Sequence, residues 1–243
     1  MKINYTVISN DPIIGGTTMK IGIIGAMQME VDALQAAMTA STAETVSGIT
    51  FVTGRIGNHH IVAAQCGIGK VNAALCVQVL CDCYGVTHVV NTGIAGSLSA
   101  DLDIADLVIS KDAMYHDVDC VHFGYEMGKV PGMDTVAFPA DKAMMDLALE
   151  AVEAVNPGHG KIGRVATGDL FVAEKAAKER IIQVTGAICT EMEGAAIAQT
   201  AYRNGIPFVI LRAISDKADD SAEMDYPTFE RIAAHRCAEV TMK

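Results

Sequence analysis

The chain has 243 residues, of which 51% are hydrophobic and 19% charged, a composition that fits one large α/β domain and excludes an intrinsically disordered protein. Its formal net charge is −11 without any basic run, which argues against nucleic acid as a partner, because nucleic-acid binding depends on neutralising phosphates with Lys and Arg. The longest uncharged apolar stretches, such as 71–81, are shorter than the roughly 20 residues that cross a bilayer, and 1–18 lack the pattern of a signal peptide, so we expect no membrane association and a cytoplasmic location.

The first predicted elements are a strand and a helix. Apolar residues run from 19 to 26, and from Glu30 onwards they recur at helical spacing. Residues 49–55 and 60–65, separated by Gly57-Asn58, predict a β-hairpin, and 70–84 predict a long buried helix after a Gly-rich turn. Residues 1–18 precede this pattern, so we expect an extension or a misassigned start there, and one domain over 19–243.

The rest of the chain alternates between strands and helices. Strands are predicted at 87–93, 106–111, 161–167, 187–190 and 207–213, and helices at 141–155, 174–184, 193–204 and 227–241. This alternation favours a largely parallel or mixed sheet with helices on both faces, to which the early hairpin adds the antiparallel part. No internal repeat or linker divides the pattern.

Five apolar strands end in a polar or Gly-rich cluster. The clusters are Gly-Ala-Met at 25–27, Asn-Thr-Gly-Ile-Ala-Gly at 91–96, Ala-Thr-Gly-Asp at 166–169, Cys-Thr-Glu-Met-Glu at 189–193 and Arg-Ala-Ile-Ser-Asp at 212–216. Ligands of open α/β sheets bind outside the carboxyl ends of the strands, so we expect these clusters to converge on one crevice. The glycines at 22 and 25 do not complete a dinucleotide fingerprint, and 67–71 lack the Ser or Thr and the spacing of a P-loop.

The cysteine and histidine residues predict no metal site, and we expect no cofactor. Cys81 and Cys83 are too closely spaced for a usual zinc half-site, and no second pair complements them. The histidines and aspartates between 116 and 122 have generic spacing, for which surface or interface positions are expected. The 7 cysteines are scattered, mostly in apolar segments, which indicates reduced thiols.

The strand-end clusters resemble, in order and at matching spacing, those of the methylthioadenosine/S-adenosylhomocysteine nucleosidases of the nucleoside phosphorylase superfamily. The matching segments run from residue 19 almost to the C-terminus: GIIGAM with a Glu three residues later, GIGKVNAA, VVNTGIAG, HDVD with FGYE and PG, TGD-x-F, EMEG and RAISD. The resemblance implies a single-domain α/β/α sandwich with a central twisted mixed sheet, usually assembled as a homodimer.

The same resemblance implies hydrolysis of the N-glycosidic bond of 5′-methylthioadenosine and S-adenosylhomocysteine, with release of adenine and the 5′-thio-substituted ribose. Fold alone does not determine the reaction. The alternative is therefore another nucleosidase or phosphorylase of this fold, acting on a futalosine-type nucleoside, AMP or a purine nucleoside.

Two carboxylates carry the implied mechanism. Asp216 matches the general acid that protonates N7 of adenine as the C1′–N9 bond lengthens, and Glu30 matches the carboxylate that activates the attacking water. The alternatives are an exposed helix-capping Asp at 216 and an acidic first-turn residue at 30 that interacts with the helix dipole. Because an ordinary Asp has a pKa of about 3.9, Asp216 can hold a proton at pH 7 only if it is buried or lies near another carboxylate.

The sugar and base contacts are implied in the same way. Glu193 matches the residue that binds the ribose hydroxyls, with Met192 packed beside the sugar and Glu191 in a supporting position. Phe171 matches the aromatic that stacks on adenine, and the backbone of Val172 matches the group that reads the edge of the base. Ordinary core positions are the alternatives for the methionine and the phenylalanine.

The remaining matches surround these contacts. Arg212 and Ser215 match positions that orient Glu193 and Asp216, and Met27 lies beside the water-activating residue. Ile94 departs from relatives that have Ser near the sugar and the water. The segment matched to the pocket for the 5′-substituent, partly across the dimer interface, contains Val121, Phe123, Tyr125 and Pro131.

The sequence favours hydrolysis over phosphorolysis. The clusters after Gly25 and Gly67 contain no arginine that could bind phosphate, and an ionised Glu30 would repel an anion beside C1′. A non-catalytic nucleoside sensor would need Phe171 and Glu193 but neither of the two catalytic carboxylates. The presence of both favours an enzyme whose partners are a small-molecule adenine nucleoside and water.

Overall fold

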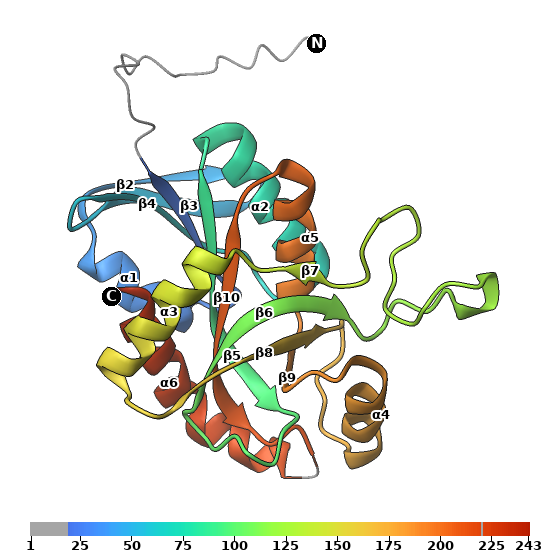
Figure 1. Ribbon diagram of the computed structural model, residues 1–243. Coiled ribbons are helices and arrows are strands. Elements are labelled where there is room, and N and C mark those ends of the chain that lie inside the picture. Colours follow the sequence, from blue (N-terminus) through green and yellow to red (C-terminus); the bar gives the residue numbers. More distant parts are fainter. Residues whose placement is uncertain (1–18, 220) are drawn as a thin grey trace.

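The computed structural model describes residues 19–219 and 221–243 (Figure 1). The strands are β1 (Lys20–Gly25), β2 (Thr39–Val46), β3 (Ile49–Ile56), β4 (His59–Gln65), β5 (His88–Ser97), β6 (Leu107–Tyr115), β7 (Phe138–Pro139), β8 (Gly160–Thr167), β9 (Cys189–Glu191) and β10 (Phe208–Asp216). The helices are α1 (Gln28–Ala37), α2 (Lys70–Tyr84), α3 (Lys142–Val155), α4 (Lys175–Thr185), α5 (Gly194–Asn204) and α6 (Ala222–Thr241), and η1 (Val121–Phe123) is a 3₁₀ turn. The predicted extension at 1–18 lies outside the described residues.

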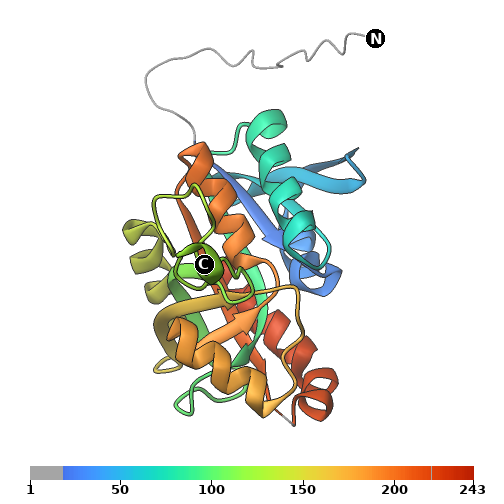
Figure 2. The same ribbon diagram turned by 90° about the vertical axis from the view of Figure 1, so that its right-hand side faces the viewer.

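These strands belong to one mixed sheet, in the order β10-β6-β8-β9-β5-β1-β4-β3-β2 with β7 on β6. Helices α1, α3 and α6 pack on one face and α2 and α5 on the other, as Figures 1 and 2 show. Apolar side chains fill the space on both faces of the sheet, for example Leu80 of α2 and Ile197 of α5 on one face, and Ile109 of β6 and Ala233 of α6 on the other. The predicted α/β/α sandwich with a mixed central sheet is therefore confirmed.

One half of the sheet closes on itself. Strand β5 pairs with β10, β10 with β6, β6 with β8, β8 with β9, and β9 returns to the end of β5 through Gly96 and Ser97. Strand β9 has only three residues, so it bridges the two longer strands just where their carboxyl ends lie. The closure brings residues from β5, β8, β9 and β10 around a common point.

Several elements differ from the sequence expectations. Strand β2 was not predicted, because its residues are mostly exposed on both faces and show no apolar alternation; it is held only by antiparallel pairing with β3. The short strand β7 was also missed. Helix α6 begins at Ala222 and not at 227, and it accommodates Pro227 with the loss of one backbone N–H donor.

Helix α2 has the predicted bounds but is not buried all round. One face packs on the sheet, whereas Val71 is 79% exposed and Leu75 is also exposed. Periodicity cannot separate these two situations when both faces of a helix carry apolar residues. In the part of the chain that the structure describes, no helix combines the length and apolar character needed to cross a membrane.

Candidate active site

The carboxyl ends of β1, β5, β8, β9 and β10 meet at one place, as their sequence clusters predicted. Glu30, in the first turn after β1, accepts a hydrogen bond from the backbone N–H of Ile94 on β5 at 3.1 Å. A Cβ added to Gly93 would collide with the guanidinium of Arg212 from β10 and lie 2.6 Å from Oε1 of Glu30. Only a glycine therefore allows these two charged side chains to approach the strand.

Glu30 is held by three backbone donors, two at the start of α1 and one on β5. Its Oε2 accepts from the N–H groups of Ala26 at 2.7 Å and Met27 at 2.9 Å, and Oε1 accepts from Ile94. The residue thus caps its helix, so the first-turn interpretation describes part of its role. Because the side chain is also fully buried, burial raises the pKa of Glu30 above its usual value, against the opposing effect of Arg212 and the N–H donors.

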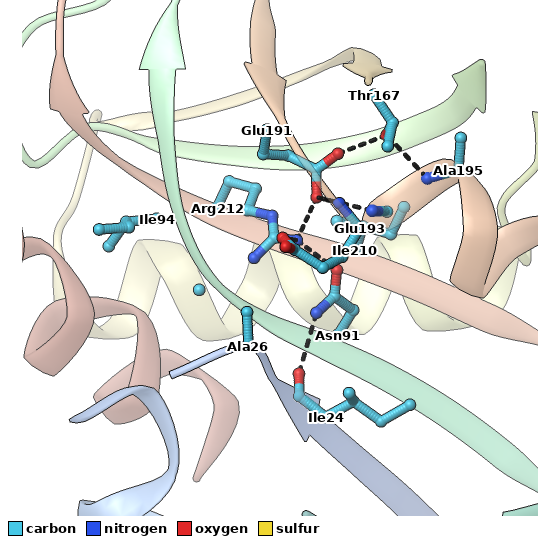
Figure 3. A network of polar contacts seen from close by, with 12 residues as sticks. Ile24, Ala26, Asn91, Ile94, Thr167, Glu191, Glu193, Ala195, Ile210 and Arg212 are labelled. Atoms are coloured by element: carbon cyan, nitrogen blue, oxygen red, sulfur yellow. Dashed lines mark hydrogen bonds and ion pairs between the residues drawn. The ribbon is translucent and has the colours of Figure 1, made fainter. Parts of the chain in front are cut away.

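A buried network centred on Arg212 joins β1, β5, β8, β9 and β10 (Figure 3). Arg212 Nη2 donates to a carboxylate oxygen of Glu191 and, at 2.6 Å, to Oδ1 of Asn91. Asn91 donates to the carbonyl oxygen of Ile24 at 2.9 Å, and Thr167 Oγ1 donates to the other oxygen of Glu191. Charge-assisted bonds of this kind, out of contact with water, make a rigid support for the site.

Glu191 also fixes the start of α5. Its Oε2 accepts from the backbone N–H of Gly194 at 2.7 Å and of Glu193 at 3.2 Å, and the N–H of Ala195 donates to Thr167 Oγ1 at 2.8 Å. These groups satisfy N–H donors that a helix N-terminus leaves without partners. The supporting position expected for Glu191 from the sequence is where the structure places it.

Glu193 lies beside this network as the N-cap residue of α5. Its Oε1 accepts from the backbone N–H of Gly69 at 2.8 Å, and its Oε2 lies 3.7 Å from Arg212 Nη2. Burial and the neighbouring charge of Glu191 raise the pKa of Glu193 to about 7. A carboxylate in this position can accept hydrogen bonds from adjacent hydroxyl groups of a sugar.

We expect Glu193→Gln to stabilise the fold at pH 8 while it weakens activity. A folded-state pKa raised from 4.5 to about 7 means that the stabilising contribution of the proton is complete below about pH 4.5 and is lost as the pH rises through about 7. An amide does not titrate. The free energy of unfolding of the variant should therefore exceed that of the parent by on the order of 1 to 3 kcal/mol at pH 8 and by little at pH 4.5. Denaturant unfolding of both proteins at the two pH values measures this. A difference in stability that is the same at both would contradict it.

Asp216 ends β10 as a buried carboxyl group. It accepts hydrogen bonds from Ser215 Oγ and from the backbone N–H of Ala218, both at 2.8 Å, and it is 2% exposed. Burial raises the pKa of Asp216 above its usual value. Helix α6 begins later, at Ala222 with Ser221 as its N-cap, so the alternative of an exposed helix-capping aspartate is wrong.

Two aromatic side chains, Phe171 and Tyr226, line one side of the site. Phe171 is half exposed and meets the ring of Tyr226 edge-on with 5.4 Å between ring centroids, and Tyr226 donates from its hydroxyl to Met27 Sδ at 3.4 Å. Phe171 is therefore not a core aromatic, and its open face is available for stacking. The next residue, Val172, is buried in a small apolar cluster, and Met192 is half-buried beside Glu193.

The segment expected to line the 5′ pocket lies apart from the carboxylates. It projects between β6 and β7, at the right of Figure 1, with Phe123 80% exposed and Val121, Tyr125 and Pro131 also exposed. Within one chain the structure does not bring these side chains to the site. His116, expected at a surface or interface, is instead buried, with neither ring nitrogen hydrogen-bonded.

Sequence reasoning assigned no role to three residues that shape the site. Asn91 and Gly69 lie inside the motifs NTGIAG and GIGK, and their contacts with Arg212 and Glu193 depend on distant strands. Tyr226 lies in α6 and carried no local signal. Its position beside Phe171 follows only from how α6 packs.

The charges of the site favour a reaction in which the bound ligand develops positive charge. The buried carboxylates of Glu30, Glu191 and Glu193 surround a single guanidinium, and Arg212 is the one buried arginine among residues 19–219 and 221–243. Carboxylates that are already positioned in the folded site stabilise a cation that develops during a reaction, and they repel an anion. In the same described ranges, no group of three or more His, Cys, Asp or Glu residues is arranged to hold a metal ion.

Comparisons with known proteins agree with this chemistry. The sequence model of the phosphorylase superfamily matches residues 20–243. The 5′-methylthioadenosine/S-adenosylhomocysteine nucleosidase of Staphylococcus carnosus is 39% identical over 224 residues, which cover 92% of this chain and 97% of the relative.

Solved structures show the same similarity. An S-adenosylhomocysteine nucleosidase from Streptococcus pyogenes, in complex with 5-methylthiotubericidin, superposes with a TM-score of 0.90 at 35% identity over 93% of this chain and 96% of the other. A futalosine hydrolase of Helicobacter pylori superposes with a TM-score of 0.88 at 33% identity over 92% and 96%.

Proposed function

The chain belongs to the phosphorylase superfamily, and on that premise we propose that it is an N-glycosyl hydrolase of adenine nucleosides. Its substrates are 5′-methylthioadenosine and S-adenosylhomocysteine, from which it releases adenine and the 5′-thio-substituted ribose. The observation that carries the proposal is the pair of buried carboxyl groups, Glu30 in the first turn of α1 and Asp216 at the end of β10, each with a raised pKa. Nucleosidases of this substrate class are similar over nearly the whole chain.

In the proposed reaction each carboxyl group moves one proton. Asp216 gives its proton to N7 of adenine as the electrons of the C1′–N9 bond pass to the base, so adenine leaves as a neutral molecule. Glu30 takes a proton from water as the water oxygen bonds to C1′. Glu193 accepts hydrogen bonds from the ribose hydroxyls, and its negative charge stabilises the cationic sugar.

Phosphorolysis is disfavoured by the pairing of the buried arginine. Arg212 is engaged by Glu191, Glu193 and Asn91, so it is not available to bind phosphate. A phosphate ion would also meet the carboxylate of Glu30, which lies against the same strand. The alternative of futalosine hydrolysis keeps the same carboxylates and differs in the 5′-substituent.

The direct test is adenine release from a panel of nucleosides. We expect the purified protein to release adenine from 5′-methylthioadenosine and S-adenosylhomocysteine with higher kcat/KM than from adenosine, because the apolar side chains of the segment 121–131, contributed by a second copy of the chain, suit a thioether. The panel includes a futalosine-type nucleoside and AMP. Preferential cleavage of either one would show that the protein is instead a nucleosidase for that substrate.

We further propose that the enzyme is a homodimer and that it works in the cytoplasm. Two apolar surfaces in the described part of the chain support the dimer. One is the exposed segment with Phe123, and the other is a shallow groove between α2 and α5 to which Val71 and Leu75 contribute. A second copy that covers them would bury the apolar area and bring Phe123 to a neighbouring site.

Phe123→Asp should therefore weaken the dimer and the use of thioether substrates together. We expect a monomer at micromolar concentration by light scattering and a KM for 5′-methylthioadenosine raised by roughly 10-fold, since a desolvated aromatic contact contributes about 1 to 3 kcal/mol. Leu147→Asp is the matched control, because Leu147 is equally apolar and 65% exposed but lies on α3. A parent protein that is fully active as a monomer would disprove the proposal.

A further inference from the structure

We propose that Lys70, Asp117 and Asp169 form a charged clasp that fixes three substrate-binding loops against one another. This inference rests on the proposed function, because it assigns a positioning role for that reaction. Lys70 is the first residue of α2, directly after the turn that follows β4, whereas Asp117 lies in the segment after β6 and Asp169 in the loop between β8 and α4. From the sequence, Asp117 was expected at a surface or interface, and no role was assigned to Lys70 or Asp169.

The clasp is a closed set of charge-assisted contacts. Lys70 Nζ lies 2.5 Å from Asp117 Oδ2 and 3.6 Å from Asp169 Oδ2. The backbone N–H of Asp169 donates to the same Asp117 Oδ2 at 3.0 Å, and the backbone N–H of Lys70 donates to Asp169 Oδ1 at 2.9 Å. Each residue therefore contacts both of the others, and two of the bonds fix backbone and not only side chains.

Each clasped loop carries a group of the candidate site. Gly69 precedes Lys70 and donates its N–H to Glu193 at 2.8 Å. Asp169 is two residues before Phe171, the residue matched to adenine stacking. Asp117 begins the segment that leads to Phe123, which is matched to the 5′ pocket. The clasp thus links the contacts for ribose, base and 5′-substituent.

The backbone at this place is shaped for the clasp. Gly69 has φ +97°, a conformation that side chains disfavour, and a Cβ there would lie 3.2 Å from Asp169 Oδ1. Lys70 Nζ also lies 5.5 Å from the centre of the Tyr115 ring, which favours a cation at that position.

These contacts differ from an ordinary surface ion pair. The side chains of Lys70 and Asp117 are 23% and 27% exposed and join segments 47 residues apart, although the side chain of Asp169 is 50% exposed. By contrast, Lys142 and Asp146 are one turn apart on α3 with side chains 79% and 54% exposed. Exposed pairs of the second kind contribute little, whereas a partly buried network that also binds backbone is stronger.

The clasp acts through binding and not through the chemical step. When the loops are already aligned, none of the energy of the contacts with the nucleoside is used to order them. The affinity for the nucleoside is therefore higher than it would be with mobile loops. Without the clasp, part of that energy is used to order the loops. The carboxyl groups of Glu30 and Asp216 are held by other contacts and keep their geometry.

The test is a double-mutant cycle on Lys70→Met and Asp117→Asn in the full chain, with 5′-methylthioadenosine as substrate. Each single variant should raise KM by about 10-fold and change kcat by less than about 3-fold, a loss typical of a charge-assisted contact. The double variant should be no worse than either single one, because both substitutions break the Lys70–Asp117 ion pair and Asp117→Asn also removes the carboxylate charge that Lys70→Met leaves unpaired. Lys142→Met with Asp146→Asn is the control pair, for which KM stays within about 2-fold.

Three further measurements separate a positioning role from general damage to the protein. Lys70→Arg keeps the cation and should recover most of the affinity. Raising KCl from about 0.05 to about 0.5 M should raise KM of the parent, since the clasp is partly screened, and leave KM of the double variant unchanged. Thermal unfolding shows whether any variant is simply misfolded.

The outcomes are distinct for the clasp and for the function. Additive losses in the cycle, a loss carried mainly by kcat, or a KM shift equal to that of the control pair would overturn the clasp while the parent still releases adenine. A parent that releases no adenine from this substrate would overturn the proposed function instead.

Discussion

Replacing Asp216 by Asn is expected to lower kcat by about 10²- to 10⁴-fold, the range for loss of a general acid, while folding and nucleoside binding persist. The amide has the shape of the carboxyl group and can still accept from Ser215 Oγ or the N–H of Ala218. It cannot, however, transfer a proton to the departing base. Single-turnover adenine release and equilibrium binding of a non-hydrolysable nucleoside separate the two effects.

Activity should also depend on pH in a defined direction. Burial raises the pKa of Asp216, so its acid form persists to higher pH than in an ordinary aspartate, and activity should fall as the pH rises through that pKa. The residual rate of the Asn variant should lack this loss. Asp101→Asn, a charge-matched change at an aspartate whose side chain is 83% exposed, is the control and should alter kcat by less than about 3-fold. Near-normal turnover of the Asp216 variant would remove the residue from the mechanism.

Glu30→Gln is expected to abolish hydrolysis and leave adenine binding largely intact. Water is a weak nucleophile that requires a base, and loss of a positioned base costs about 10²- to 10⁴-fold. The amide oxygen can accept from Ala26 and Met27, but the amide NH₂ then faces the N–H of Ile94. We therefore also expect a lower Tm, which unfolding experiments measure separately. Asp32→Asn, an exposed change on the same helix, is the control.

Added phosphate separates hydrolysis from phosphorolysis. The parent should release adenine and free sugar at full rate in phosphate-free buffer, because the nucleophile is water and the site is negatively charged. Product analysis with and without added phosphate measures this. Accumulation of a sugar 1-phosphate, with activity that rises from near zero as phosphate is added, would assign the protein to the phosphorylases.

Local chemistry made much of the fold predictable. Apolar runs, helical spacing and Gly-rich turns located β1, the β3–β4 hairpin, α2 and most later elements, because these signals depend on residues close in the chain. Strand β2 gave no such signal, since both of its faces are exposed. The start of α6 was misplaced because Pro227 is typical of a helix beginning.

The candidate residues were predictable for a different reason. Strand-end clusters contain polar and Gly residues that a buried strand would otherwise exclude, and these clusters, with the first turn after β1, contain Glu30, Glu193, Arg212 and Asp216. The burial and the hydrogen-bond partners of these side chains depend on segments far away in the chain. Whether Asp216 is an exposed cap or a buried acid depends on where α6 begins, and the spacing of apolar residues did not locate that start.

By itself the sequence determined the element types and the chemical groups at the strand ends, because each follows from residues within one turn or one strand, and it indicated the mixed sheet through the order of these elements. Only the tertiary structure decided that β9 closes half of the sheet onto β5, that Arg212 pairs with Glu191, and that Lys70 meets Asp117. The two ion pairs join residues that are 21 and 47 positions apart in the chain. Their geometry comes from how strands and helices pack together, which no local pattern encodes.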